Sequence, residues 1–382
     1  MKFKVNKGPF LKDKRTTTSI MLELFAVLCV IWGVSIAYYS INLNFLAGLR
    51  VFSVVGLSIL TTLIVDVVMS LIKGNRKIKD IGKYVLKSYS YVTAIIFGLC
   101  LPAGTSFYVV VIGAIVASVI GKYVFGGFGN NIFNPAIIGR IFVGLSFGDK
   151  LQTLKVSETT SSGVDIVSGA TITSNINWSE TIKPEVGYLK MILGQYQGAI
   201  GETCTALLIV AAIYLIIRGI VNYRLTLSFL LTFTLCSLGI GLVNRVDNIG
   251  EYLLTSLSVG GLMFGAVFMI TDPVTSPKSQ DGKIIYATIA GFLAIFIRVF
   301  SSYPEGVMFA IALSNMITPL IDSSIKGNTF DNLTKRYFRI AIVMVVCVAI
   351  ATGYAAIPFE EETASVYSDT NTMLTIGGEI YE

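Results

Sequence analysis

The feature that most limits how this chain can fold is a series of long apolar runs separated by short polar segments. About eleven runs approach the roughly 20 apolar residues that a helix needs to cross a bilayer. They cover residues 19–41, 51–72, 89–102, 107–125, 132–147, 204–221, 225–243, 253–270, 284–300, 307–321 and 338–358. With 54% hydrophobic and 14% charged residues, the 382-residue chain is too apolar for an ordinary soluble domain. We therefore predict an all-α, polytopic membrane protein with about eleven transmembrane helices.

The first ten runs divide into two groups of five, and each group is interrupted at a comparable place. The segment GGFGNNIFNPAIIGR (126–140) precedes the fifth run, and SYPEGVMFAIALSNMITPLID (302–322) opens the tenth. Short runs marked by Gly and Pro are typical of broken or re-entrant helices that line a cavity. Because five is odd, successive units have opposite orientations, which predicts a ten-helix core of two inverted five-helix repeats.

Basic residues gather at alternate ends of the predicted helices, which fixes their orientation. The N-terminal arm and the loop after the second run are rich in Lys and Arg, so both are expected to be cytoplasmic. The predicted order is a cytoplasmic arm (1–18), a first membrane unit (19–147), an outer loop (148–202), a second membrane unit (203–325), a cytoplasmic linker (326–337), an extra transmembrane helix (338–358) and an acidic outer tail (359–382).

Several kinds of chemistry are disfavoured by composition. The chain contains no histidine, which removes haem ligation by histidine and most catalytic triads. Its five cysteines lie in separate apolar runs without CxxC spacing, so we predict neither a disulfide framework nor a metal site. The net charge of +6 reflects membrane topology, and no basic, aromatic-rich face for nucleic acid is present. Any redox chemistry must therefore come from a cofactor held in another way.

The predicted outer loop contains the polar stretch DIVSGATITS (165–174). The hydroxyl of Thr171 follows Ser168, Gly169 and Ala170, whose small side chains leave the backbone free to enter the cleft of a modifying enzyme. The carboxylate of Asp165 could orient the loop or be recognised by that enzyme. The alternative is a simple solvated turn rich in Ser, Thr and Gly.

The pattern D-x-x-S-G-A-T resembles the motif at which a flavin transferase joins FMN to threonine, and Asp165, Ser168, Gly169, Ala170 and Thr171 match it completely. Most of the chain is similar to the membrane-subunit family that includes NqrB of the sodium-pumping NADH:quinone oxidoreductase and RnfD of the Rnf complex. The stretches that carry this resemblance are KRTTTSIMLELFAVL, KYVFGGFGNNIFNPAIIGR, GAIGETCT, MFGAVFMITDPVTSP and YPEGVMFAIALSNMITPLID.

The resemblance implies an electron-transfer subunit in a prokaryotic plasma membrane. It implies FMN bound covalently through a phosphoester to Thr171 and electron transfer coupled to Na⁺ or H⁺ transport within a larger complex. The implied partners are the other subunits, including an outward-facing flavoprotein like RnfG or NqrC, and a flavin transferase. It also implies a second, non-covalent flavin, riboflavin, near Asn131 and Asn134, whose carboxamides can match the edge of a flavin ring. The alternative for both residues is to cap the short helix that follows them.

Acidic residues inside the apolar runs are candidates for ion passage, because a charge at membrane depth is costly and usually paired or functional. Glu23 and Asp66 are the deepest by count, and their oxygens suit a hard cation such as Na⁺. Structural pairing is the alternative for each. A structural role is favoured for the charged residues near the ends of runs, namely Arg140, Glu202, Asp272, Arg298, Glu305 and Asp322.

Length and the N-terminal TTTSIM segment favour an RnfD-like protein. The continuation SGATITS, however, resembles the motif of the outward-facing flavoprotein partner more than that of the usual membrane subunit. An NqrB-like subunit and a flavin-based extracellular electron-transfer system are the related alternatives. From a different class, the same architecture also suits a transporter or channel without redox activity, and a third possibility is an assembly scaffold.

Overall fold

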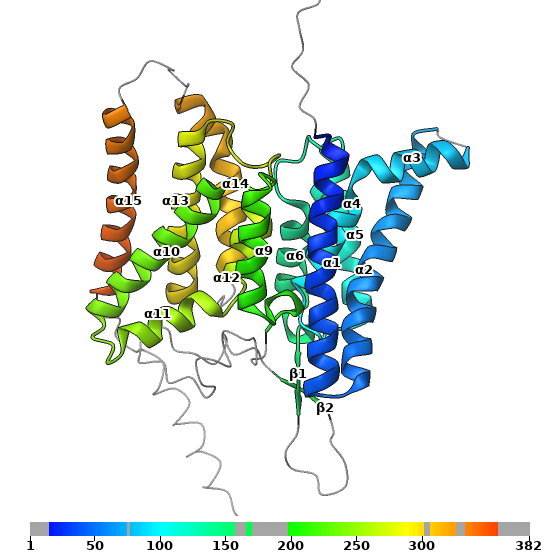
Figure 1. Ribbon diagram of the computed structural model, residues 1–382, viewed down its shortest axis with the longest axis horizontal. Helices are drawn as coiled ribbons and strands as arrows, with labels where there is room; N and C mark the ends of the chain where they lie inside the picture. Colours follow the sequence, from blue (N-terminus) through cyan, green and yellow to red (C-terminus); the bar gives the residue numbers. More distant parts are fainter. Residues whose placement is uncertain are drawn as a thin grey trace, which may run out of the picture.

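Helices make up nearly all of the described structure (Figure 1). The computed structural model describes residues 15–74, 77–156, 166–169, 198–301, 306–325 and 333–357. The first group of helices is α1 (Thr17–Asn42), α2 (Phe45–Ile72), α3 (Ile78–Ser88), α4 (Ser90–Leu99), α5 (Phe107–Ser118) with its π-helical continuation η1 (Val119–Tyr123), and α6 (Pro135–Ser146). The second group is α9 (Thr205–Ile217), α10 (Tyr223–Val243), α11 (Ile249–Ser258), α12 (Leu262–Phe264) with its π-helical continuation η4 (Gly265–Met269), α13 (Gln280–Phe300), α14 (Gly306–Ser324) and α15 (Leu333–Ala355).

The polytopic, helical prediction is confirmed, because each predicted apolar run coincides with one helix or with a bent pair. Among the described residues, six helices are long and apolar enough to cross a membrane, and the bent pair of α11 and α12 with η4 would make a seventh. The other runs form four shorter apolar helices, Ser90–Leu99, Phe107–Tyr123, Pro135–Ser146 and Thr205–Ile217. Helices of this length cross the hydrocarbon core only partly by themselves. Most residues of α4 are buried by neighbouring helices, whereas α9 keeps one side exposed.

Polar side chains at the ends of the apolar runs set where several helices begin. The Oγ1 of Thr16 accepts from the backbone N–H of Ser19 at 3.2 Å, and the Oδ1 of Asn44 accepts from Ala47 at 2.8 Å. Asn222 caps α10 in the same way. Such caps satisfy backbone donors that have no partner within the helix. Helices α1 and α10 begin two residues before the predicted runs, whereas α2 begins six residues before its predicted run.

The predicted run at 253–270 is not one continuous helix. It divides into α11 and the pair α12 with η4, which are bent by 59° relative to each other. Gly260 and Gly261 have φ values of 78° and 71°, in the left-handed region that favours glycine. The side chain of Arg298 supports the break, because its guanidinium donates to the carbonyls of Ser256 at 2.6 Å and Val259 at 3.1 Å. Those carbonyls lose their helical partners at the bend.

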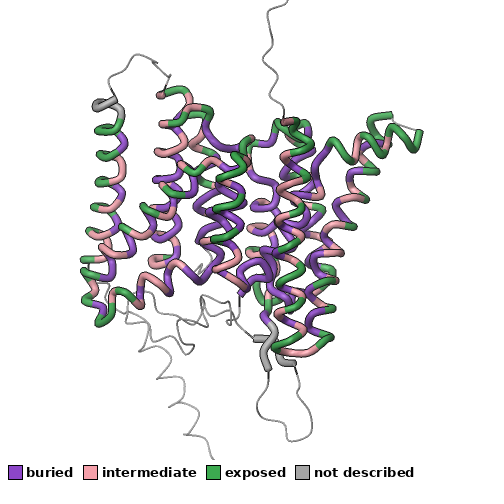
Figure 2. Tube along the Cα trace, viewed as in Figure 1, coloured by how far each residue is buried: buried purple, intermediate pink, exposed green. Residues whose placement is uncertain are grey.

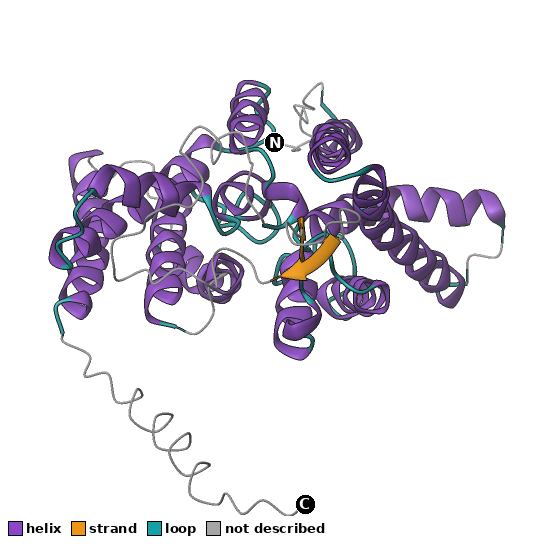
Figure 3. Cartoon of the chain, turned by 90° about the horizontal axis from the view of Figure 1, so that it is seen from below, coloured by secondary structure: helices purple, strands orange, loops and turns teal. Residues whose placement is uncertain are grey.

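Two elements were missed by the sequence prediction. Helix α3 lies within the predicted cytoplasmic loop, and a two-stranded antiparallel ribbon of β1 (Thr153–Val156) and β2 (Ile166–Gly169) lies within the predicted outer loop. Both fall outside the long apolar runs, so hydropathy did not reveal them. In Figure 1 they lie at opposite ends of the helical array, and Figure 3 shows the ribbon from its own end.

The two groups of helices pack mainly within themselves. Helices α1, α2, α4, α5 and α6 form one bundle, α10, α13, α14 and α15 form the other, and α6 contacts α14 between them. Buried residues gather where the helices meet, whereas exposed residues follow the outer surfaces (Figure 2). Helix α15 packs on α10 and α13 at the side of the second bundle. The side chain of Thr352 on α15 packs against the backbone of α10 at Gly239, where a Cβ would lie 2.2 Å from the Cγ2 of Thr352.

Candidate functional site

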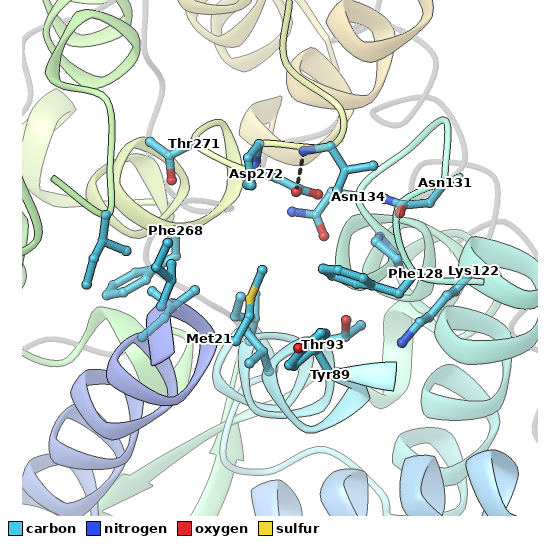
Figure 4. A pocket seen from close by; sticks show the side chains of 18 of the residues that line it. Met21, Tyr89, Thr93, Lys122, Phe128, Asn131, Asn134, Phe268, Thr271 and Asp272 are labelled. Atoms are coloured by element: carbon cyan, nitrogen blue, oxygen red, sulfur yellow. Dashed lines mark hydrogen bonds between the residues drawn. The ribbon is translucent and has the colours of Figure 1, made fainter. Parts of the chain in front are cut away.

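A pocket lies between the first and second groups of helices, at the end of the array where α1 begins (Figure 4). Its volume is about 90 Å³ when measured by the centres of water-sized spheres. It is about 760 Å³ when all the space between the lining atoms and the open mouth is counted. The walls come from the first turns of α1, the start of α4, η1, the segment before α6, residues 220–221 and the end of η4 with the loop after it. Both groups of helices thus contribute to one pocket.

Apolar and aromatic side chains form most of the wall. Met21, Phe128 and Phe268 surround the space in Figure 4, with Tyr89 below. Tyr89 is held in the left-handed region at φ 52°, its ring meets Phe128 edge-on at 4.7 Å, and its hydroxyl lies 2.8 Å from that of Thr18. A pocket of this kind suits a flat apolar ring system whose polar groups lie on one edge.

Asn134 is the polar residue that joins the two bundles at the pocket. Its Oδ1 accepts from the backbone N–H of Ala136 at 3.1 Å and so caps α6, whose first residue is Pro135. Its Nδ2 donates to the carbonyl of Met269 at 3.3 Å, at the end of η4. The capping prediction is therefore confirmed for Asn134. A carboxamide has two N–H donors and two oxygen lone pairs, so one of each remains for a ligand.

Asn131 also lines the pocket but is not the cap of α6. It is 7% exposed, and its Nδ2 donates to the carbonyl of Phe133 at 3.1 Å. Its side chain also interacts with that of Asp272, which lies in the loop after η4 on the same side of the pocket (Figure 4). Because capping does not explain this buried amide, its second donor and its contact with Asp272 favour a role in the pocket.

Asp272 is a pocket residue to which the sequence analysis gave only a structural role. It lies in the loop after η4, and its Oδ1 accepts from the backbone N–H of Val274 at 3.0 Å (dashed line in Figure 4). Burial raises the pKa of this carboxyl to about 6, although its hydrogen bonds with Val274, Thr275 and Asn131 oppose the shift. The carboxyl therefore changes its charge close to neutral pH. Its position directly after a broken run was the available signal.

Only part of the flavinylation motif lies within the described residues. Ser168 and Gly169 belong to β2 and pair with Leu154 and Thr153 of β1, whereas Asp165, Ala170 and Thr171 lie outside the described residues. The β1–β2 ribbon lies at the end of the molecule opposite the pocket (Figure 1).

Glu23 and Asp66 belong to different polar clusters. Glu23 joins α1 to α9, because its Oε1 accepts from the Nε of Arg218 at 2.5 Å and from the hydroxyl of Tyr214 at 2.8 Å. This is the pairing that the structural alternative predicts. Asp66 is fully buried on α2 and accepts hydrogen bonds from hydroxyl groups of Ser90 and Tyr123.

The remaining charged residues near the ends of runs serve the fold where the structure describes them. The Nε of Arg140 donates to the carbonyl of Cys100 at 3.0 Å, and Asp322 accepts from the backbone N–H of Lys278 at 3.0 Å. The contacts of Arg298 at the bend are of the same kind. Glu305 lies outside the described residues.

Comparison with known proteins adds an independent observation. The sequence matches the model of the NQR2, RnfD, RnfE family over residues 4–331. It is 37% identical over 240 residues to the D-type subunit of the proton-translocating ferredoxin:NAD(+) oxidoreductase complex of Clostridium ljungdahlii, covering 61% of this chain and 71% of that protein. Over 329 residues it is 29% identical to the D-type subunit of the Na(+)-translocating ferredoxin:NAD(+) oxidoreductase complex of Acetobacterium woodii, covering 85% of this chain and 94% of that protein.

A third relative comes from the other branch of these complexes. The chain is 31% identical over 237 residues to the B-type subunit of the Na(+)-translocating NADH-quinone reductase of Chromohalobacter salexigens, covering 61% of this chain and 57% of that protein. Helix α15 begins at Leu333, beyond the residues that match the family.

Proposed function

The chain belongs to the NQR2, RnfD, RnfE family, and we propose that it is the RnfD-like electron-transfer subunit of an ion-translocating oxidoreductase complex. Two relatives are D-type subunits of ferredoxin:NAD(+) oxidoreductase complexes, one proton-translocating and one Na(+)-translocating. In this proposal the subunit carries FMN bound covalently to Thr171 and riboflavin in the pocket of Asn131 and Asn134. It acts together with the other subunits and not as an enzyme alone.

The observation that supports this proposal is that the pocket and the β1–β2 ribbon, which holds Ser168 and Gly169 of the motif, lie at opposite ends of one helical array. The pocket lies where α1 begins, and the ribbon that leads to Thr171 lies beside the other end of α1 (Figure 1). A subunit that moves electrons from one face of a membrane to the other requires redox groups near both faces.

The residues of the pocket fit a flavin. The rings of Phe128 and Phe268 offer apolar surface to the flat ring system, while the amides of Asn131 and Asn134 offer donors and acceptors to its polar edge. When bound, the flavin supplies the one- and two-electron chemistry. The protein orients it, limits access of water through the apolar walls and sets the charge beside it through Asp272.

The charge of Asp272 gives a prediction for the flavin in the pocket. Above a pH of about 6 this carboxyl is ionised, and a negative charge beside the flavin disfavours reduction. Replacing Asp272→Asn is therefore expected to raise the midpoint potential at about pH 8 and to change it little at about pH 5, where aspartic acid is also neutral. Spectroelectrochemical titration at both pH values measures this. An equal shift of the midpoint potential at both pH values would mean that the Asp272 carboxyl does not titrate beside the flavin.

We extend the proposal to the membrane topology. All eleven predicted runs cross or enter the membrane, and the four short helices together with the bent pair form the broken spans of two inverted repeats. Two observations support this arrangement. Residues from both groups of helices line the pocket, and α6 of the first group contacts α14 of the second. The pocket then faces the cytoplasmic side, and the motif loop and the C-terminal tail face outward.

Cysteine labelling tests this topology. In a variant without the native cysteines, exposed Gln152→Cys and Ile357→Cys are expected to react with an impermeant maleimide added to intact cells, whereas exposed Lys79→Cys reacts only after lysis. Residue 152 precedes β1, residue 79 belongs to α3 and residue 357 follows α15. If residue 357 were labelled only after lysis, α15 would not cross the membrane.

The proposed partners follow from the same topology. An outward-facing flavoprotein like RnfG or NqrC would exchange electrons with FMN on Thr171, and a flavin transferase would attach that FMN. The decisive experiment for the function is to purify the complex from the native host and reduce it with its low-potential donor. Both flavins of this subunit should be reduced during turnover. A purified subunit without flavin would favour a non-redox transporter, and flavin that never becomes reduced would favour a scaffold.

A further inference from the structure

A buried polar cluster beside the pocket has no part in the flavin contacts described above. We call it the Asp66 cluster: Asp66 of α2, Ser88 and Ser90 at the junction of α3 and α4, and Lys122 and Tyr123 of η1. Asp66 is 0% exposed and Lys122 is 2% exposed. Burying a carboxylate and an ammonium group inside a membrane protein is costly unless both are well paired. Their contacts therefore indicate what this cluster can hold.

The carboxylate of Asp66 is surrounded by hydroxyl donors. Its Oδ1 accepts from the Oγ of Ser90 at 2.8 Å and from the hydroxyl of Tyr123 at 2.5 Å, and its Oδ2 accepts from the Oγ of Ser88. Hydrogen bonds from three hydroxyl groups stabilise the ionised carboxylate in place of water.

The ammonium of Lys122 reaches the carboxylate through one hydroxyl. Its Nζ donates to the Oγ of Ser90 at 2.6 Å and to the backbone carbonyl of Ser88. Ser90 thus receives a hydrogen bond from Lys122 and gives one to Asp66. The two charges are joined by a chain of two hydrogen bonds.

Irregular backbone brings these groups together. Tyr89, in the left-handed region at φ 52°, separates α3 from α4, so that Ser88 and Ser90 both reach Asp66. The π-helical turn η1 carries Lys122, and it lies against the start of α6 at Gly121, where a Cβ would be 2.8 Å from the Cα of Pro135. Such π-turns are frequent at functional sites.

We infer that the Asp66 cluster is a proton site, in which the Lys122 ammonium occupies the position that Na⁺ would otherwise take among these oxygens. Na⁺ favours the same carboxylate, carbonyl and hydroxyl oxygens. A proton moves along the chain when the N–H bond of Lys122 breaks and its proton joins the Ser90 oxygen, while the Ser90 O–H bond breaks and that proton joins Oδ1 of Asp66. The products are a neutral amine and a neutral carboxylic acid, so charge and atoms balance.

The position of Lys122 connects this site to the pocket. Lys122 lines the pocket wall, and its Nζ lies 5.9 Å from the centre of the Phe128 ring (Figure 4). Negative charge that enters the pocket draws the transferred proton back from Asp66 through Ser90 to Lys122, and the carboxylate left on Asp66 takes up a second proton from solution. This use of the site in ion translocation rests on the proposed function, whereas the proton chemistry of the cluster does not.

The other titratable groups that face the cluster are few among the described residues. Tyr84 of α3 interacts with Tyr123, and the Nζ of Lys73 lies 5.2 Å from the centre of the Tyr84 ring. Tyr89 lies between the two serines, with its hydroxyl next to that of Thr18. A test must therefore identify the Asp66 carboxyl itself, which infrared spectroscopy does through its C=O stretch.

The experiment is a pH titration of the purified full-length protein in lipid nanodiscs, followed by infrared difference spectroscopy, with choline or Na⁺ as the cation. Acidification is expected to produce a protonated-carboxyl band that Asp66→Asn lacks and that Glu23→Gln, a change in the other acidic cluster, retains. The titration midpoint of the unaltered protein should be the same in choline and Na⁺. A midpoint that falls as Na⁺ rises would show a Na⁺ site and overturn the inference.

Variants of Lys122 test why Na⁺ is excluded. With Lys122→Gln the position among the oxygens is open, so the midpoint should fall by about one pH unit for each tenfold rise in Na⁺. Lys122→Arg retains a cation, so the titration midpoint of this variant should not change with the Na⁺ concentration. If the titration midpoint of Lys122→Gln also does not change with the Na⁺ concentration, the Lys122 ammonium does not occupy a Na⁺ position, and the inference fails.

A second pair of variants tests the hydrogen-bond chain and remains informative if Lys122→Gln does not fold. Ser90→Ala removes the hydroxyl that joins the two charges, so it is expected to shift the titration midpoint. Ser88→Ala removes another contact of Asp66 but leaves that chain intact, so its shift should be smaller. Equal shifts would contradict the chain through Ser90. None of these measurements requires flavin, so their failure is distinct from failure of the proposed function.

Discussion

Replacing Thr171→Val is expected to abolish the covalent flavin and electron transfer through the complex, while the protein still folds in the membrane. Valine has nearly the shape of threonine but lacks the hydroxyl that forms the phosphoester. Thr171 follows the last residue of β2 by two positions in a polar stretch of the sequence, so loss of one hydroxyl should cost the membrane core little. In-gel flavin fluorescence after denaturation measures the attachment, and thermal unfolding of the purified protein measures the fold.

Three controls sharpen this result. Thr171→Ser keeps a hydroxyl and is expected to retain partial modification, and expression in a host without the flavin transferase should give an unlabelled but folded protein. Ser174→Ala changes a nearby hydroxyl outside the D-x-x-S-G-A-T pattern and should leave fluorescence unchanged. Fluorescence that persists in the valine variant would place the attachment site at another residue.

The double replacement of Asn131 and Asn134 by leucine is expected to empty the pocket of extractable flavin. Each change leaves a polar group of the ligand without its partner, at a cost of about 1–3 kcal/mol. Even the lower value for both, about 2 kcal/mol, weakens binding by about 30-fold. Flavin released by acid from the purified protein measures this, and the covalent FMN should remain because its attachment is at the opposite end of the array.

The double variant needs controls because Asn134 has a second role in the structure. Asn134 also caps α6, and loss of a cap costs about 1 kcal/mol, so lost flavin could reflect a disturbed helix. Asn134→Ser keeps a capping oxygen but removes the amide, and Asn131→Leu leaves the α6 cap untouched. Both single variants should therefore lose flavin affinity with little change in thermal stability. Unchanged extractable flavin would refute the pocket assignment and leave Asn134 with its structural role alone.

Hydropathy predicted the parts of the fold that bilayer physics determines. Runs as long and apolar as α1, α2 and α10 have few other stable states, and caps such as Thr16 and Asn44 mark their beginnings in the sequence. Gly and Pro also marked the short helix α6, whereas the tenth run, marked in the same way, forms the continuous helix α14. The break between α11 and α12 was not predicted, because it depends on the contact of Arg298 with carbonyls about 40 residues earlier in the chain.

The candidate site was predictable only in part. The resemblance pointed to Asn131 and Asn134, and the structure places both at a pocket. The sequence analysis gave Asp272 only a structural role and did not single out Lys122, because their neighbours come from distant segments that only the folded chain brings together. The same holds for the Asp66 cluster, in which α2, the junction of α3 and α4, and η1 meet. Asp165 and Thr171 lie outside the described residues, so their role depends on the motif alone.

Peptide mass spectrometry of the protein purified from its native host tests the central proposal most directly. The peptide that contains DIVSGATITS should carry the added mass of FMN less one water, and fragmentation should assign it to Thr171. That result would establish covalent flavin at the end of the array opposite the pocket. An unmodified peptide from active complex, or FMN on a different residue, would contradict the account.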